Sequence, residues 1–475
     1  MENKFSLPKD LYPYQIEDSE KMLSIGNWLN FSEMGVGKTP ETLNVVEQGN
    51  FQIPLIICPN SLRLEWKRQI EDWVGPDNCA VGDGYLKVGP IIRSLKEGQK
   101  YKILNYEALR KEEILDILQY IPFDVIIFDE IHKLRNPKTK LVEGASKDRW
   151  EREERQGGVW KFLNQHPEAK IIGLSGSPIM NYPNDLYVPL SVVNPEKYPR
   201  AITPWRHFMY KYCLWSDGRY GPYMYGTRNL ERLREETSPF IIRRTKKEVL
   251  PFLPDKYYRR AMLEMQPDQR KLYDQMEREL KILLDTGEPL WSTNVLSCLT
   301  RLRQINLDPK IVGVTSSSAK TEFIMDTIES TDGKLVIFSC FEKYIYLLHL
   351  MLEGTPHSMI TGQVPANQRQ EEVKKFQEDD KVKLCLGTIQ AMGEGITLTA
   401  SSNVILADRW WNRPVCDQAV DRLHRIGQKN AVMVIYPICE DSVDATLDQI
   451  LERKYTASQS YYSETEVRQT VLGGL

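Results

Sequence analysis

Short apolar runs recur along this chain, and each is followed by a polar or glycine-bearing turn and then by a helical pattern. The runs are apolar on both faces, which is typical of parallel strands covered by helices on both sides. Strands that alternate with helices predict α/β units. The predicted strands are residues 53–58, 123–128 and 170–174 in the first part of the chain, and residues 334–340, 382–386, 403–407 and 431–436 in the second.

The stretch between these two parts has a different pattern. It opens rich in aromatic residues after Pro204, and Leu272, Met276, Leu280 and Leu283 then recur at helical spacing. This predicts a mainly helical insertion. We therefore expect a first α/β domain over residues 1–195, an insertion over 196–310, a second α/β domain over 311–455 and a C-terminal tail over 456–475.

Composition narrows the functional class only slightly. The 475 residues carry a net charge of −3, which neither indicates nor excludes a surface that binds nucleic acid. No apolar run is long enough for a membrane span, and the N-terminus lacks the apolar core of a signal peptide, so we expect a cytoplasmic protein, or a nuclear one in a eukaryote. The eight cysteines form no Cys-x-x-Cys pair, which disfavours structural zinc.

The first candidate for chemistry is the series Gly35-Val36-Gly37-Lys38-Thr39. Glycines allow successive backbone N–H groups to point into one concavity around phosphates. Lys38 can reach the β- and γ-phosphates, and Thr39 can place its hydroxyl on magnesium. Ser32 stands where the generic phosphate loop has its first glycine. The alternative is a glycine turn that arose by chance.

Asp129 and Glu130 follow the apolar run 123–128 directly. Such an acid pair can direct Asp129 toward magnesium, while Glu130 orients or deprotonates the attacking water. The alternative is a capped loop with surface acids. Because the acid pair and the phosphate loop occur in the order and context that ATP hydrolysis requires, we favour a nucleotide site.

Arg422 and Arg425 are three residues apart, so on a helix they would share one face. Both guanidinium groups could contact charge that develops on the γ-phosphate, and Gln418 lies one turn earlier on the same side. Alone, this segment is typical of a basic surface helix. The preceding motifs favour a site formed by two halves of one chain.

Together these residues resemble the superfamily 2 helicases and translocases, and within them the Swi/Snf-related ATPases, from about Leu11 to about Tyr436. The most specific matches are residues 240–249, residues 302–309, and Trp410-Trp411 followed by the His424-Arg425-Ile426-Gly427-Gln428 series. Gln15 is similar to the adenine-reading glutamine, whose amide offers both a donor and an acceptor. The resemblance also implies a nucleotide contact at Gly395. Glu394, beside it, replaces a residue that is often small or apolar in the family.

The resemblance implies an ATP-driven motor with ATP and Mg²⁺ as cofactors. Two RecA-like domains would close on ATP, and double-stranded or branched DNA would be held mainly at its phosphates. The expected DNA contacts are polar and basic residues in loops at strand ends and in the 240–249 motif: Ser61, Arg63, Tyr106, Ser175, Ser177, Arg243, Arg244, Lys246, Ser339, Thr361, Thr388 and Trp411.

The leading hypothesis is a monomeric DNA-dependent ATPase that translocates on duplex or branched DNA. Its motifs occupy nearly the whole chain, which suits a compact bacterial or phage-like motor in recombination, repair or fork remodelling rather than a nucleosome remodeller.

One alternative is a helicase that separates strands with a wedge in the insertion. Another is a scaffold or clamp that binds ATP and hydrolyses it slowly; intact Lys38, Glu130, Arg422 and Arg425 count against it. An RNA motor is disfavoured by the Swi/Snf motifs.

Overall fold

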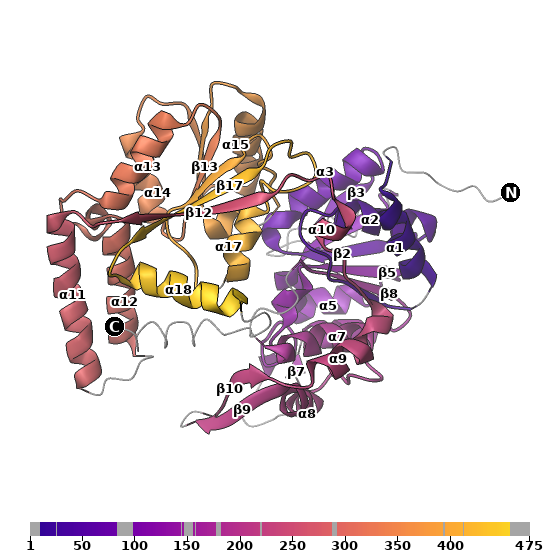
Figure 1. The fold of residues 1–475 in the computed structure, drawn as a ribbon. Helices are drawn as coiled ribbons and strands as arrows, with labels where there is room; N and C mark the ends of the chain where they lie inside the picture. Colours follow the sequence, from indigo (N-terminus) through magenta and orange to yellow (C-terminus); the bar gives the residue numbers. More distant parts are fainter. Residues whose placement is uncertain are drawn as a thin grey trace. The chain divides into compact units, whose positions relative to one another are not determined.

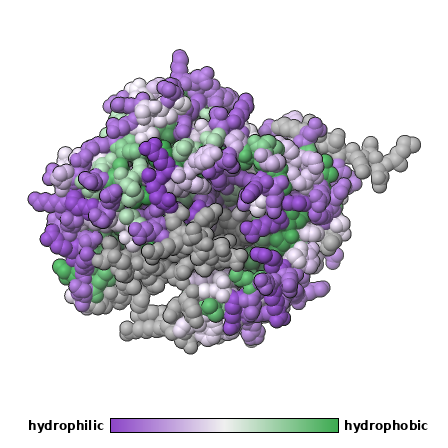
Figure 2. Space-filling model, in the orientation of Figure 1, coloured by the Kyte–Doolittle hydropathy of each residue, from purple (hydrophilic) through white to green (hydrophobic). Residues whose placement is uncertain are grey.

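The chain divides into two compact units, residues 1–251 and 252–475, and each is described by itself. The structure, a computed structural model, describes residues 10–24, 26–82, 98–143, 145–146, 155–156, 158–176, 182–218, 221–286, 292–392, 395–411 and 413–456. The predicted DNA contact at Ser177 and almost all of the predicted tail lie outside these residues. No helix in the described part of the chain is long and apolar enough to cross a membrane. Figure 2 shows hydrophilic residues over much of the visible surface of each unit, with hydrophobic residues in smaller groups.

The first unit is built on a seven-stranded sheet whose strands are all parallel (Figure 1). Across the sheet, the strands are β11 (Ile241–Ile242), β1 (Trp28–Asn30), β8 (Lys170–Leu174), β5 (Val125–Asp129), β2 (Pro54–Cys58), β4 (Tyr101–Asn105) and β3 (Cys79–Val81). The helices are α1 (Pro13–Ser24), α2 (Lys38–Gln48), α3 (Arg63–Trp73), α5 (Glu112–Leu118), α6 (Val159–Gln165), α7 (Tyr187–Val193), α8 (Ile202–Tyr212), α9 (Leu230–Thr237) and α10 (Lys246–Val249). Two antiparallel pairs join β9 (Cys213–Gly218) to β10 (Gly221–Thr227) and β6 (Ala145–Ser146) to β7 (Arg155–Gln156).

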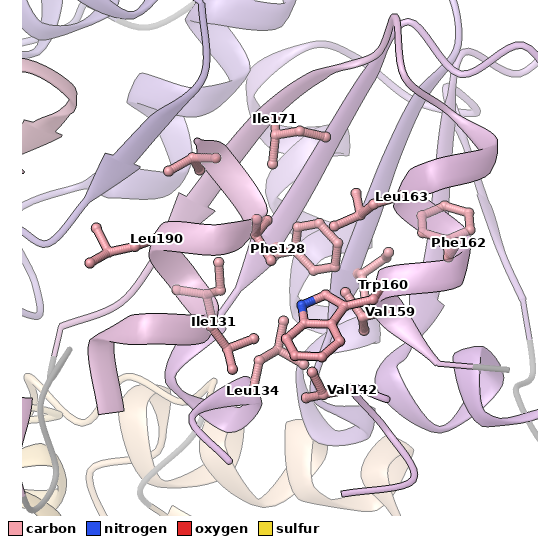
Figure 3. Close-up of a cluster of buried hydrophobic side chains, with 14 of the residues drawn as sticks. Phe128, Ile131, Leu134, Val142, Val159, Trp160, Phe162, Leu163, Ile171 and Leu190 are labelled. Carbon is pink, nitrogen blue, oxygen red and sulfur yellow. The ribbon is translucent and has the colours of Figure 1, made fainter. Parts of the chain in front are cut away.

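Both faces of this sheet are buried, as the uninterrupted apolar runs predict. Successive side chains of a strand point to opposite faces. In β5, Ile126 and Phe128 belong to one hydrophobic cluster, whereas Val125 and Ile127 belong to another on the opposite face. Figure 3 shows part of the first cluster, which contains Phe128 and Ile171 of the sheet and Val159, Trp160, Phe162 and Leu163 of α6.

The second unit contains a six-stranded sheet, also parallel throughout. Its strands, in order across the sheet, are β12 (Lys256–Leu263), β17 (Val432–Cys439), β16 (Asn403–Leu406), β13 (Leu335–Ser339), β15 (Leu384–Thr388) and β14 (His357–Ile360). Its helices are α11 (Pro267–Asp285), α12 (Thr293–Leu307), α13 (Ala319–Ser330), α14 (Glu342–Met351), α15 (Ala366–Glu378), α16 (Ile389–Met392), α17 (Arg413–Val420) and α18 (Val443–Thr456). The same alternation holds here, because Val336 and Phe338 of β13 lie in one cluster and Leu335 and Ile337 in another.

These two parallel sheets with covering helices confirm the predicted α/β class and are consistent with tandem RecA-like domains. The segment predicted as an insertion contributes to both units. Its α8, β9, β10 and α9 belong to the first unit, and β12, α11 and α12 belong to the second, where α11 and α12 lie side by side (Figure 1). The domain boundaries expected at residues 195 and 310 stay predictions.

Candidate nucleotide site

Three loops that carry candidate chemistry leave adjacent strands of the first sheet. The strands β1, β8 and β5 are neighbours, with Asn30 opposite Leu174 and Leu174 opposite Asp129. Parallel strands end at the same edge, where α/β folds bind their ligands. The phosphate loop after β1, the acid pair at the end of β5 and Ser175 after β8 are therefore brought together, and the Ser175 amide donates to the Asn30 carbonyl at 3.0 Å.

The phosphate loop has the backbone that its glycines predict. Gly35 and Gly37 have φ angles of 82° and 87°, in the left-handed region, and α2 begins at Lys38. The Lys38 ammonium donates to the carbonyl oxygens of Ser32, at 2.8 Å, and Glu33, at 3.0 Å. The lysine is thus positioned over the loop, and it could exchange these carbonyls for phosphate oxygens.

Gln15 on α1 is bound directly to this loop. Its Nε2 donates to the carbonyls of Gly37, at 3.1 Å, and Val36, at 3.3 Å, while its Oε1 accepts from the Tyr12 amide at 2.9 Å. A Cβ at Gly37 would lie 2.2 Å from the Gln15 Nε2, so the glycine is required for this contact as well as for its φ angle. The side chain proposed to read adenine therefore also fixes the loop, and adenine recognition stays a prediction.

Asp129 is a partly buried carboxylate with two hydrogen-bond donors. The Trp66 indole N–H donates to its Oδ2 at 2.8 Å, and the Glu130 amide donates to its Oδ1 at 3.0 Å. Burial, followed by repulsion from Glu130, raises the pKa of Asp129 to about 7, although Trp66 and Lys38 oppose the shift. Two acids held this close in a buried position favour the arrival of a cation.

Glu130 has a left-handed backbone, with φ 54° and ψ 47°, an uncommon conformation for a residue with a Cβ. The next residues form a short 3₁₀ helix, Ile131–Leu134, whose Ile131 and Leu134 are buried in the hydrophobic cluster of Figure 3. This anchoring holds the turn that presents the Glu130 carboxylate.

His132 links the acid pair to the loop after β8. Its Nδ1 lies 3.1 Å from the Glu130 Oε2 and 2.9 Å from the Ser175 Oγ.

Tyr106, expected to contact DNA, is buried, and its hydroxyl donates to the Asp129 carbonyl at 2.8 Å. The sequence motifs did not predict a role for His132, or contacts of Trp66 and Tyr106 with Asp129. The one signal was their place inside or beside recognised motifs.

The donor set at this edge fits magnesium. Carboxylate and hydroxyl oxygens are the ligands that this hard cation prefers, and Asp129 and Thr39 supply one of each. Burial raises the pKa of Asp129 most, and the nearby charge of Glu130 adds to the shift; a bound cation would offset both effects. These residues would hold Mg²⁺, which would neutralise phosphate charge there.

In the second unit, the predicted helix ends before the two arginines. The helix α17 stops at Val420, and Arg422 and Arg425 lie in the turns that follow, so the expectation that they share a helix face is wrong. Tertiary contacts replace the helix here. The Arg425 Nη1 donates to the Ile396 carbonyl, at 3.1 Å, and to the Thr397 Oγ1, at 2.7 Å.

The same turns are tied to the loop that contains Gly395, which has a φ of 69°. The Leu398 amide donates to the Arg422 carbonyl at 2.9 Å. The Gln428 Nε2 donates to the carbonyls of Ser401, at 2.8 Å, and Leu423, at 3.2 Å. Gln418 lies on α17, as expected. Whether these residues act on a nucleotide held by the first unit stays a prediction.

The residues expected to contact DNA fall into two groups. Arg243 is exposed, whereas the other described side chains are buried or partly buried: Ser61, Arg63, Tyr106, Ser175, Arg244, Lys246, Ser339, Thr361, Thr388 and Trp411. Ser339 and Thr388 are the last residues of the adjacent strands β13 and β15, and Thr361 follows β14, so all three lie at one edge of the second sheet.

Several of these side chains have partners within their own unit. The Ser339 hydroxyl donates to the Asp408 carboxylate at 2.6 Å, and the Arg303 guanidinium lies over the Trp411 ring at 4.6 Å. The Arg244 guanidinium donates to Asp18. These contacts give the residues structural roles, and their DNA contacts stay predictions.

Comparisons with known families agree with the motifs. A model described as the SNF2-related domain matches residues 20–311, and a helicase conserved C-terminal domain matches residues 319–427. Among curated proteins, the cattle (Bos taurus) DNA annealing helicase and endonuclease ZRANB3 is 27% identical over 443 residues, which are 90% of this chain and 38% of that protein. The Xenopus tropicalis SWI/SNF-related matrix-associated actin-dependent regulator of chromatin subfamily A-like protein 1 is 27% identical over 477 residues, which are 97% of this chain and 46% of that protein.

The chain therefore spans less than half the length of these relatives. A solved structure titled "Sulfolobus solfataricus SWI2/SNF2 ATPase core in complex with dsDNA" is 25% identical, with a TM-score of 0.42, and covers 96% of this chain and 93% of that chain.

Proposed function

We propose that this chain, which belongs to the SNF2-related ATPases of helicase superfamily 2, uses ATP hydrolysis to move along duplex or branched DNA. The family implies ATP hydrolysis. The movement, the DNA substrate and the biological role are our inference from the site and the relatives.

One observation carries the proposal: the residues predicted to bind phosphate, to hold a cation and to orient a water lie at one edge of the first sheet. Lys38 is positioned over the phosphate loop, and Asp129 and Glu130 lie at the end of the strand two places away in the sheet. The chemistry of phosphoryl transfer needs charge stabilisation and an oriented water. Lys38 meets the first need. Glu130, held by its left-handed turn and by His132, meets the second.

We further propose that Arg422 and Arg425 complete the site when the two units close on ATP. Their guanidinium groups would stabilise charge on the γ-phosphate. Hydrolysis would then release the closed state, and alternate closing and opening would move the units along DNA. A grip on phosphates would make this movement independent of sequence.

The preferred substrate is branched DNA, in recombination, repair or fork remodelling. The printed name of the cattle relative, a DNA annealing helicase, supports this choice. The protein would act as a monomer on DNA that it does not need to unwind.

The decisive experiment compares ATPase rates without DNA and with single strands, duplex, three-way junctions and four-way junctions. We expect duplex and junctions to stimulate turnover more than single strands do. The affinity for DNA should fall on the order of a thousand-fold for six phosphate contacts as salt rises from 50 to 200 mM, so the stimulation at a fixed, subsaturating DNA concentration should fall with it. Lys38→Ala should abolish turnover on every substrate.

The same substrates separate the alternatives. Displacement of a third strand from a triplex without unwinding of a fork identifies a translocase, whereas unwinding of a forked duplex identifies a strand-separating helicase. Slow turnover that no DNA stimulates identifies a scaffold or clamp and refutes the proposal.

A further inference from the structure

A short segment of the first unit, residues 241–246, binds the phosphate loop at several points. It lies shortly before residue 252, where the chain enters the second unit. The strand β11 pairs with β1, which leads directly into the phosphate loop, and the Phe31 amide donates to the Ile242 carbonyl at 2.8 Å. We call residues 241–246 the docking segment.

The docking segment and the loop exchange hydrogen bonds beyond the strand pairing. The Arg244 amide donates to the Ser32 Oγ at 3.1 Å, and the Glu33 amide donates to the Arg244 carbonyl at 2.9 Å. The Glu33 carboxylate accepts from the Lys246 amide at 2.9 Å, where α10 begins. The Ser32 hydroxyl, at the place of a glycine in the generic loop, thus binds the docking segment.

The Arg244 side chain makes a second connection, through α1. Its Nε and Nη2 donate to the two oxygens of Asp18, at 2.9 and 2.5 Å, and its Nη2 lies 3.2 Å from Glu17. Asp18 is only 1% exposed, so this bidentate pair fixes the guanidinium geometry. Asp18 lies about one helical turn after Gln15, whose amide donates to the carbonyls of Gly37 and Val36. Arg244 therefore reaches the loop both directly and through α1.

Nucleotide binding must disturb this arrangement. In this structure the Lys38 ammonium donates to the carbonyls of Ser32 and Glu33, the two loop residues that also bind Arg244. If Lys38 turns to a phosphate, it releases those carbonyls. Because Glu33 is held at its amide and carboxylate by the docking segment, any change at its carbonyl is transmitted to Arg244 and Lys246.

We propose that Arg244 is a positioning residue that couples nucleotide binding at the phosphate loop to the docking segment before the second unit. This role rests on the proposed function only in that the loop binds ATP. It requires no DNA and no movement. The coupled elements are the loop residues 32–33, α1 and residues 241–246.

The test measures amide hydrogen exchange over residues 28–36 and 241–250 in the full chain, with and without a non-hydrolysable ATP analogue. We expect the analogue to change exchange at the amides of Glu33, Arg244 and Lys246 by at least about five-fold, a typical size for coupling between sites. In Arg244→Gln this dependence on nucleotide should disappear, and the affinity for a fluorescent ATP analogue should fall about ten-fold.

Two further variants separate positioning from simple loss of stability. Arg244→Lys keeps a cation that can reach one Asp18 oxygen, so it should restore part of the nucleotide dependence. Ser32→Ala removes one bond and should weaken the dependence, even if Arg244→Gln does not fold. The matched control is Arg234→Gln, because Arg234 is an exposed arginine on α9 in the same unit. It should behave like the unmodified chain.

The proposal is overturned if the unmodified chain binds the analogue with no change in exchange at 241–250. It is also overturned if Arg244→Gln or, should that variant not fold, Ser32→Ala retains the full change. If exchange responds to the analogue in the unmodified chain while no DNA stimulates its ATPase, the proposed function fails and the coupling stands.

Discussion

At the scale of single residues, adjacent carboxylates in one motif have different surroundings. Asp129 accepts hydrogen bonds from Trp66 and from the Glu130 amide, whereas Glu130 projects from a left-handed turn toward His132. The first arrangement suits a carboxylate that holds a cation. The second suits one that orients a water.

Glu130→Gln should therefore separate binding from hydrolysis. The amide is nearly isosteric and can still accept a hydrogen bond, but it cannot take a proton, so hydrolysis should fall by about 10²–10⁴. Single-turnover hydrolysis and equilibrium binding of ATP check this prediction. Glu113→Gln, at an exposed position on α5, is the matched control. A parallel loss of affinity and rate would instead show that Glu130 serves the structure of the loop.

The indole of Trp66 should set the acidic side of the pH–rate profile. Burial and Glu130 raise the pKa of Asp129 to about 7, and the Trp66 hydrogen bond opposes this shift. In Trp66→Phe the pKa should rise further, because the carboxylate loses a donor while staying buried. Binding of Mg²⁺ requires the ionised form, so the acidic limb of the ATPase profile should move to higher pH, and activity lost at pH 7 should return at pH 8–9. A profile that falls equally at every pH contradicts this explanation.

At the scale of elements, strands with apolar runs were predictable, whereas very short strands and the largely polar strand β12 were not. Residues 170–174 form β8 as expected, because Ile171, Ile172 and Leu174 make a short apolar run between turns. The strand β1 has three residues and β11 has two, too few for any periodicity. Their pairing is determined by contacts between residues more than 200 positions apart. For that reason the sequence showed the docking segment only as part of the 240–249 motif, and its contacts with the phosphate loop could not be predicted.

In the candidate site, too, residues in short local motifs could be predicted, whereas features that depend on tertiary contacts could not. Local signals predicted Lys38, Asp129 and Glu130, since each belongs to a motif of a few residues. The helix expected around Arg422 and Arg425 was wrong, because spacing alone cannot show that α17 ends at Val420 and that tertiary hydrogen bonds hold the following turns. The burial of Ser339 was likewise set by the tertiary fold.

The helices α8 and α9 are joined by a charged cluster around Glu236, which makes a stability prediction possible. Burial alone would raise the pKa of Glu236, but hydrogen bonds from Lys211, Arg232 and Tyr212 outweigh it and lower the pKa to about 2. A lowered carboxylate pKa stabilises the fold above pH 4.5, and this contribution is lost as the pH falls toward 2.

Glu236→Gln should accordingly cost about 1 kcal/mol near pH 7, a value discounted because the cluster is close to solvent. The difference from the unmodified chain should shrink between pH 4.5 and 2. Urea unfolding of both proteins across this range measures it, with Glu235→Gln, an exposed neighbour on α9, as the control. If the difference in the free energy of unfolding between the two proteins is constant with pH, Glu236 stabilises the fold by packing and not by its charge.

At the scale of the whole molecule, each unit has its own sheet and buried clusters, and the chemistry is distributed unequally between them. The first unit holds the residues predicted to bind a triphosphate and to orient a water. The second supplies the candidate arginines on turns fastened to the loop after Gly395. The proposed motor would need this inequality, because its hydrolysis would depend on whether the units are closed.

Substitutions at and around Arg425 can test whether this residue acts in hydrolysis or has only a structural role. Its guanidinium donates to the Ile396 carbonyl and the Thr397 hydroxyl, so a loss of activity in Arg425→Ala has two explanations. As a group that stabilises charge on the γ-phosphate, Arg425 should leave ATP affinity within about three-fold and lower single-turnover hydrolysis by about 10³, the smaller end of the range for arginine fingers.

Thr397→Val removes the hydroxyl partner while keeping the guanidinium, and it separates the two explanations. If Arg425 acts on phosphate, Thr397→Val should retain hydrolysis within about ten-fold, because the Ile396 carbonyl still holds the side chain. If Arg425 only braces the loop, both variants should lose hydrolysis and thermal stability together. An equal loss of hydrolysis in the two variants would show that Arg425 does not act on the phosphate. Hydrolysis would then depend on residues of the first unit alone.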